Sequence, residues 1–117
     1  MGLVLWIDQN TFVSDLVERV FKQENLPFYS LGEFEDFTYL IDDLKPTVIV
    51  LDLVTAVAHA EVLGKQYHAC EALRSTPVIT IGSGDPPEFV KVISGKIDKP
   101  FNPFELPKRI AEILKTN

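Results

Sequence analysis

The sequence has little cysteine and no excess of basic residues. Cys70 is the only cysteine, so no disulfide can form within the chain, and we interpret it as a buried thiol in a reducing cytoplasm. Eleven Lys and Arg residues stand against seventeen Asp and Glu residues, giving a formal net charge of -6. Because nucleic acids and anionic membranes would repel such a chain on average, we expect neither as a partner.

Long hydrophobic runs are also missing. The longest apolar stretch, residues 47–57, contains Asp52 and is too short to cross a bilayer. Residues 1–7 lack the basic segment and cleavage site of a secretory signal. There is no repeat, low-complexity run or linker, so we predict a single cytoplasmic domain over residues 1–117.

Short apolar runs alternate with segments of helical period. The runs cover residues 2–7, 27–31, 47–53, 77–81 and 96–98. Several carry almost no polar residue, which is typical of strands buried on both faces of a parallel sheet. With right-handed crossovers the pattern predicts an α/β fold: a five-stranded, parallel, doubly wound sheet of the flavodoxin-like type.

Four segments have the apolar spacing of amphipathic helices. The first carries a stripe with Asn10 or Thr11 placed to cap its start, namely Phe12, Val13, Leu16, Val17, Val20 and Phe21. The second ends before Pro46, and the third runs from Ala60 to Leu73. The last begins after Asn102, although Pro107 favours a start one turn later.

Polar residues stand where the predicted strands end. Asp8 and Gln9 follow the first strand, Asp52 lies in the third, and Lys99 follows the fifth. Since parallel strands bring their carboxyl ends to one edge, we expect Asp8, Asp52 and Lys99 in one charged pocket. A buried carboxylate is costly unless it is paired, hydrogen-bonded or bound to a cation. Each acid could alternatively cap the loop or helix that follows it.

The combination resembles the receiver domain of bacterial response regulators. The residues that carry this resemblance are Leu5-Trp6-Ile7-Asp8, Val48-Ile49-Val50-Leu51-Asp52-Leu53, Pro77-Val78-Ile79 and Asp98-Lys99-Pro100-Phe101. The resemblance implies a signalling module rather than an enzyme. In it Asp52 accepts a phosphoryl group from a histidine kinase, Lys99 contacts the carboxylate or phosphate, and Asp8 helps to hold Mg²⁺.

Several positions depart from the family pattern. Gln9 replaces the second of two adjacent acids, so Asp8, Asp52 and Gln9 should bind Mg²⁺ weakly if at all. Gly82 stands at the switch hydroxyl, with Ser83 one residue late, and Lys96 stands at the switch aromatic. The segment between Gly82 and Lys99 is short and contains two prolines, which predicts a shortened fourth helix.

These departures favour an atypical receiver, or pseudo-receiver, that acts mainly by binding a protein, either a histidine kinase or a downstream effector. A conventional Mg²⁺-dependent phosphorelay receiver phosphorylated on Asp52 is the alternative. A flavodoxin-like small-molecule binder is a third interpretation, because the same sheet can hold a flavin at its switch point.

Other candidates have simpler interpretations. His59 and His68 are nine residues apart and are expected at the surface or its boundary, and Trp6 is expected in the core. An acidic cluster is interpreted as the solvated face of the second helix: Glu33, Glu35, Asp36, Asp42 and Asp43. Exposed Phe34 or Phe37 beside these acids could alternatively form a docking patch.

Overall fold

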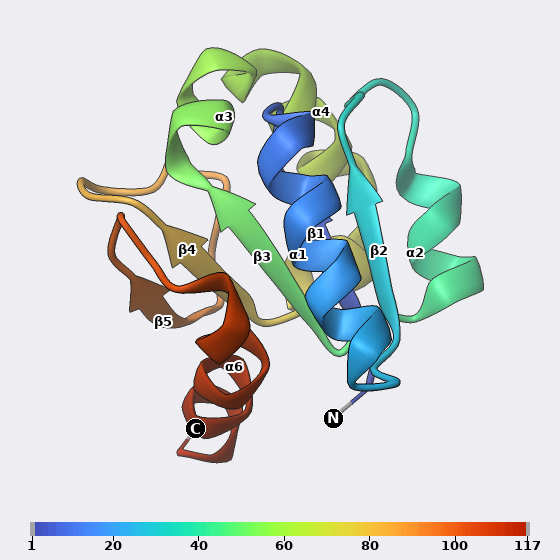
Figure 1. Cartoon of the computed structure of the whole chain (residues 1–117). Coiled ribbons are helices and arrows are strands. Elements are labelled where there is room, and N and C mark those ends of the chain that lie inside the picture. The colour runs from blue at the N-terminus through green and yellow to red at the C-terminus, as the bar shows by residue number, and fades with distance from the viewer. Residues whose placement is uncertain (1, 117) are drawn as a thin grey trace.

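The computed structural model describes residues 2–116, and its centre is a parallel sheet (Figure 1). The five strands are β1 (Val4–Ile7), β2 (Phe28–Leu31), β3 (Val48–Asp52), β4 (Val78–Ile81) and β5 (Ile93–Ile97). They are all parallel and lie in the order β2-β1-β3-β4-β5. Every residue of β1, β3 and β4 is buried, as expected for strands covered on both faces. The predicted fold class is confirmed.

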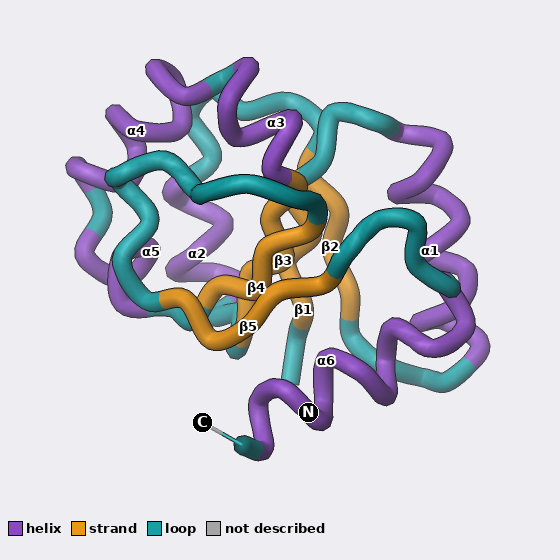
Figure 2. The backbone as a smooth tube through the Cα atoms, turned by 90° about the vertical axis from the view of Figure 1, so that its left-hand side faces the viewer, coloured by secondary structure: helices purple, strands orange, loops and turns teal. Residues whose placement is uncertain are grey.

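Helices cover both faces of the sheet. They are α1 (Thr11–Gln23), α2 (Thr38–Leu44), α3 (Leu53–Ala58), α4 (Ala60–Ala69), α5 (Glu71–Ser75) and α6 (Leu106–Lys115), the last preceded by the 3-10 turn η1 (Pro103–Glu105). Helices α1 and α6 lie on one face, and α2, α4 and α5 lie on the other (Figure 2). No helix within residues 2–116 has the length and apolar character needed to cross a membrane.

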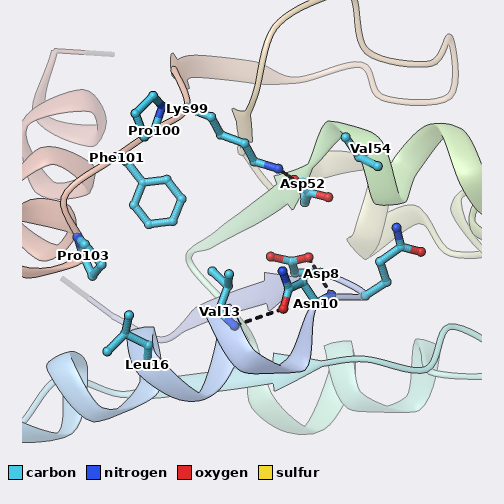
Figure 3. Close-up of a pocket in the computed structure, with 11 residues that line it drawn as sticks. Asp8, Asn10, Val13, Leu16, Asp52, Val54, Lys99, Pro100, Phe101 and Pro103 are labelled. Atoms are coloured by element: carbon cyan, nitrogen blue, oxygen red, sulfur yellow. Dashed lines mark hydrogen bonds and ion pairs between the residues drawn. The ribbon is translucent and has the colours of Figure 1, made fainter.

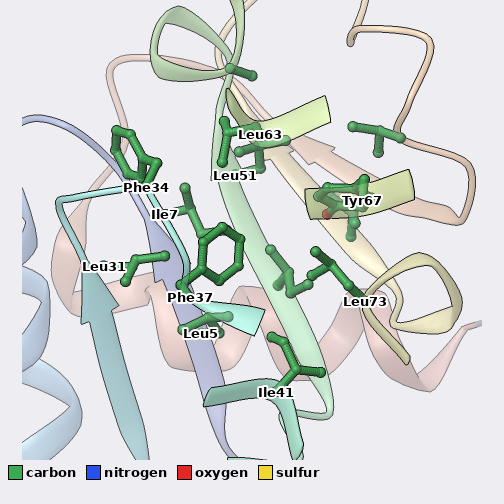
Figure 4. Packing of buried hydrophobic residues seen from close by; sticks show 14 residues of the cluster. Leu5, Ile7, Leu31, Phe34, Phe37, Ile41, Leu51, Leu63, Tyr67 and Leu73 are labelled. Carbon is green, nitrogen blue, oxygen red and sulfur yellow. The ribbon is translucent and has the colours of Figure 1, made fainter. Parts of the chain in front are cut away.

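Two apolar clusters fill the spaces between the sheet and these helices. On the side of α1 and α6, Trp6 packs with the rings of Phe28 and Phe101, which confirms its place in the core. On the side of α2 and α4, Phe34 and Phe37 point into the second cluster (Figure 4). Their exposed fractions are only 5% and 2%, so the docking patch suggested for them is wrong.

Gln66 in α4 explains why these two rings are buried. Its Oε1 accepts from the backbone N–H of Phe37 at 2.7 Å, and its Nε2 donates to the carbonyl of Phe34. These bonds fix the segment before α2 against α4 and satisfy a buried backbone donor and acceptor. The acids Glu33, Glu35 and Asp36 are exposed but lie in the segment before α2 and not on the second helix, whereas Asp42 and Asp43 do belong to α2.

The chain after β3 differs most from prediction. Helix α3 begins immediately at Leu53, and the single helix expected from Ala60 to Leu73 is divided into α4 and α5 at Cys70. Cys70 has an extended backbone and is half-buried rather than fully buried. The apolar spacing from Ala60 to Leu73 matched a continuous helix. The extended backbone of Cys70 instead changes the direction of the chain, and Leu73 packs in the core.

Residues 82–92 replace the fourth crossover helix with an irregular segment, in agreement with the predicted shortening. Phe89 of this segment packs on the ring of Tyr67 at a centroid distance of 5.0 Å and lies over Gly64, where an added Cβ would come within 3.4 Å of its ring. A side chain from the loop thus covers part of the sheet face that a helix would otherwise cover.

Strand β5 starts at Ile93 and ends at Ile97, whereas the sequence predicted residues 96–98. The middle of β5, Ser94-Gly95-Lys96, is not apolar, because β5 is an edge strand whose side chains are only partly buried. An apolar run therefore does not mark this strand in the sequence. Helix α6 packs closely on it: an added Cβ at Gly95 would lie 2.6 Å from Cγ2 of Ile113.

The starts of α1 and α6 lie close to the predicted positions. Asn10 caps α1 by accepting from the N–H of Val13, and Asn102 caps η1 before α6 begins at Leu106, next to Pro107. The buried stripe of α1 was overestimated, however. Phe12 is 78% exposed and Leu16 is 36% exposed, because α1 extends past the sheet edge at its first turns.

We expect Gln66→Ala to lower the free energy of unfolding by about 2 kcal/mol, because it leaves a buried N–H and a buried carbonyl without partners. Urea unfolding followed by circular dichroism measures this change. Gln23→Ala, at an exposed position of α1, is the matched control and should change stability by less than about 0.5 kcal/mol. Equal effects of the two substitutions would contradict the role given to Gln66.

Candidate functional site

The carboxyl edge of the sheet brings together the three residues singled out in the sequence. Asp8 directly follows β1, Asp52 is the last residue of β3, and Lys99 lies two residues after β5. Asp8 and Asp52 are only 5% and 4% exposed. Nζ of Lys99 lies 2.5 Å from Oδ1 of Asp52, and Figure 3 shows its side chain reaching across to that carboxylate. The predicted pocket therefore exists, with the lysine on Asp52.

Thr55 engages the other oxygen of Asp52. Both the backbone N–H and the hydroxyl of Thr55 donate to Oδ2 of Asp52, at 2.9 and 2.8 Å. Asp52 is in this way the N-cap of α3 as well as the partner of Lys99. The same carboxylate therefore fulfils both expectations: Oδ2 caps the helix, and Oδ1 pairs with Lys99 in the charged pocket.

Thr55 is the site residue that sequence reasoning missed. It is fully buried, its Oγ1 accepts from the N–H of Gln9 at 2.9 Å, and it lies 3.5 Å from Oδ1 of Asp8. The hydroxyl has one proton, and the nearer acceptor is Asp52. An acid that bonds to a residue three positions later is typical of a helix start. The spacing of Asp52 and Thr55 could therefore have indicated both the start of α3 and the contact between them.

Asp8 has fewer compensating contacts. Its Oδ1 accepts from the backbone N–H of Asn10 at 2.9 Å. Burial raises the pKa of Asp8 above its ordinary value; the Asn10 N–H opposes the rise, and the neighbouring Asp52 carboxylate adds to it. Lys99 lowers the pKa only slightly, because its ammonium lies on Asp52.

The residues expected to hold Mg²⁺ do not form a fitting set. Gln9 is exposed, and its Oε1 lies 3.0 Å from Nε2 of His59 instead of joining the two acids. Both oxygens of Asp52 are already engaged by Lys99 and Thr55. Within residues 2–116, no group of three or more acidic, histidine or cysteine side chains could hold a metal ion. A tightly held Mg²⁺ therefore does not fit this arrangement.

The two histidines lie where they were expected. His59 is half-buried, with its ring 4.8 Å from the ring of Phe34, and His68 is exposed.

Gly82, Ser83 and Lys96, the positions predicted to be altered, supply no hydroxyl or ring to the pocket that holds the acids. Gly82 has a φ of 114°, a conformation that disfavours a side chain, and its N–H donates to the carbonyl of Ile97. Ser83 is exposed in the following bend. Lys96 is exposed as well, and its Nζ lies 3.4 Å from the carbonyl of Gly84.

A pocket of about 590 Å³ opens beside the acids. Figure 3 shows Phe101 and Pro103 facing Val13 and Leu16 across it. Its full lining is Asp8, Gln9, Asn10, Val13, Leu16, Asp52, Val54, Lys99, Pro100, Phe101 and Pro103. The site is thus a charged floor with largely apolar walls.

Comparison with known proteins shows the fold. No protein-family model and no curated protein matches the sequence. Among solved structures, the chemotaxis protein CheY4 of Vibrio cholerae superposes with a TM-score of 0.71 at 19% identity, over 97% of this chain and 98% of that one. A response regulator receiver domain from Bermanella marisrubri gives 0.74 at 15% identity, over 97% and 99%.

A third structure is the receiver domain of a sensor histidine kinase from Pseudomonas aeruginosa, described with a magnesium ion coordinated in its active site cleft. It matches with a TM-score of 0.72 at 16% identity, over 98% of this chain and 99% of that one. The chain therefore has the fold of response regulator receiver domains along nearly its whole length, as the resemblance predicted.

The raised pKa of Asp8 predicts a specific pH dependence of stability. Below the ordinary value of 3.8, Asp8 is protonated in both the folded and the unfolded chain, so wild type and Asp8→Asn should be similarly stable. As pH rises from 3.8 through the folded pKa, the unfolded chain loses its proton first, and wild type loses stability relative to the variant. At pH 7 we therefore expect Asp8→Asn to be more stable than wild type.

Thermal unfolding at several pH values measures this difference. Asp15→Asn, at an exposed position of α1, is the control and should show no such advantage at pH 7. A destabilised Asp8→Asn at neutral pH would show that the buried carboxylate is compensated after all.

Proposed function

We propose that this chain is an atypical response regulator receiver domain: a cytoplasmic signalling module, not an enzyme, that works mainly by binding a protein partner. One observation carries the proposal. Asp8, Asp52 and Lys99 meet at the carboxyl edge of a receiver-type sheet, while Lys99 and Thr55 engage Asp52 and Gly82 offers no hydroxyl. A histidine kinase or a downstream effector is the partner class that this fold suggests.

Asp52 is the proposed phospho-acceptor position. In the transfer, one of its oxygens bonds to phosphorus while the bond from phosphorus to the donor breaks, and the leaving group departs with the electron pair. Lys99 is placed to offset the charge that develops between two anions. Oδ2 accepts two hydrogen bonds from Thr55, and Oδ1 contacts the Lys99 ammonium, so both oxygens are less nucleophilic than those of a free carboxylate. These contacts support a slow reaction.

Readout by the usual switch is unsupported by the residues present. Gly82 offers no hydroxyl that could move onto a phosphoryl group, and Lys96 offers no ring that could change its rotamer. Residues 82–92 are packed on α4 through Phe89. A binding surface that stays the same with and without phosphorylation follows from this geometry, which favours constitutive partner binding.

We expect acetyl phosphate and Mg²⁺ to add much less than one phosphoryl group per chain, because both oxygens of Asp52 are engaged. Intact-mass spectrometry over a time course measures the adduct. Asp52→Asn, which keeps an oxygen to cap α3, is the matched control. A stoichiometric adduct that disappears in Asp52→Asn would instead favour the conventional phosphorelay receiver.

We expect weak Mg²⁺ binding that Gln9→Asp strengthens by about tenfold, since the substitution adds a second carboxylate after β1 and removes the contact with His59. Quenching of Trp6, the single tryptophan, which lies two residues before Asp8, reports binding. Gln9→Asn is the control with no added charge. Equal Mg²⁺ affinity in the three proteins would show that the missing acid is not what weakens the site.

A further inference from the structure

The pocket beside Asp8 has the features of a ligand site. Its volume of about 590 Å³ lies in the range of small-ligand pockets, which combine mostly apolar walls with a few placed polar groups. Val13 and Leu16 of α1 form one wall, and Phe101 and Pro103 form the other (Figure 3). The acids lie at the inner end, so a molecule entering between these walls meets Asp8 and Asp52.

The charge at the inner end is unbalanced. Two buried carboxylates face one ammonium group, and that group pairs with Asp52. Among residues 2–116, no lysine, arginine or histidine nitrogen lies within 4.0 Å of an Asp8 oxygen. A buried carboxylate without a cation is the costly case, and a positive group placed beside it in good geometry offsets part of that cost.

Three exposed apolar side chains line the pocket or are adjacent in sequence to residues that line it. Phe12 of α1 is 78% exposed, Val54 of α3 is 59% exposed, and Phe104 of η1 is 68% exposed. Val54 lines the pocket, and Phe12 and Phe104 are sequence neighbours of the lining residues Val13 and Pro103. Large exposed side chains grouped around a cavity are typical of a protein-binding surface.

We propose that this pocket receives a lysine or arginine side chain from a partner protein, with the cationic group at Asp8 and the apolar stem between Phe101 and Val13. The inference rests on the proposed function, because it names the chemistry by which the module recognises its partner. The cation takes up the negative charge that the altered metal site leaves unbalanced. Phe12, Val54 and Phe104 contact the apolar residues that flank the basic one in the partner segment.

Other occupants fit less well. An anion would meet two carboxylates and a single lysine that is already paired. A neutral apolar group would satisfy the walls but leave Asp8 unpaired. A divalent ion needs several oxygen ligands, and Gln9 is turned to His59 while Thr55 and Lys99 engage Asp52. A monovalent cation on an apolar stem matches both the charge and the walls.

The first experiment uses n-pentylguanidinium as the probe and 1-pentanol as its neutral match, each titrated into the protein and followed by amide chemical shifts. We expect the guanidinium to cause saturable shifts at residues 8–16 and 99–104, and Asp8→Asn to weaken its binding by about tenfold. Asp15→Asn should bind like wild type. No saturable shift, equal binding of pentanol, or undiminished binding by Asp8→Asn would overturn the proposal.

The second experiment tests a protein source for the cation. The probe is a short amphipathic helical peptide with one arginine among leucines, and its control carries citrulline at that position. We expect the arginine peptide to bind more tightly than pentylguanidinium, and Phe12→Ser to weaken the peptide but not the small probe, since Phe12 is exposed and does not line the pocket. If the small probe binds and the peptide does not, a side chain of a partner protein is excluded.

These outcomes are separable from the proposed function. A stoichiometric Asp52 adduct would overturn the atypical receiver without affecting guanidinium binding at Asp8, and failure of the guanidinium to bind leaves the receiver proposal intact. The dispersed amide spectrum of Asp8→Asn shows whether that variant is folded, so lost binding is distinguished from lost structure.

Discussion

Burial of two carboxylates at the end of an apolar parallel sheet is the constraint on which the rest of the site depends. Asp52 has its charge met within the chain, by the ammonium of Lys99 on one oxygen and by the N–H and hydroxyl of Thr55 on the other. Asp8 has a backbone N–H and no cation. The two acids are therefore unequal: one is stabilised by the fold, and the other remains available to a positive group from outside.

The direct passage from β3 into α3 follows from the same interaction. An N-cap is most useful where the chain turns at once from strand to helix, and Asp52 supplies it. Asp52 lies where a phosphoryl group could reach it, but its contacts with Thr55 and Lys99 also stabilise the fold. Its action as a nucleophile would therefore compete with its structural role. This competition links the local fold to the slow chemistry proposed for the site.

A loop and not a helix follows β4. With no helix in residues 82–92, the sheet face near β5 is covered by Phe89 and Val90 and by the packing of Phe89 on Tyr67. Among the exposed large apolar side chains, Leu16 of α1 and Val54 of α3 line the pocket beside the acids, whereas others lie on β2, α2 and β5. Charge and apolar surface therefore occur together in this pocket.

The sequence by itself determined the sheet and the charged edge. Fully buried strands such as β1, β3 and β4 consist of apolar residues because both faces are covered, so their positions and the meeting of Asp8, Asp52 and Lys99 could be inferred from local patterns. Only the tertiary structure decided the rest. Edge strand β5, the burial of Phe34 and Phe37 by Gln66, and the exposure of Phe12 depend on which neighbour lies across a helix or beyond an edge. The bond from the Gln9 N–H to Thr55 and the contact of the Gln9 side chain with His59 join residues 46 and 50 positions apart, and no local pattern records them.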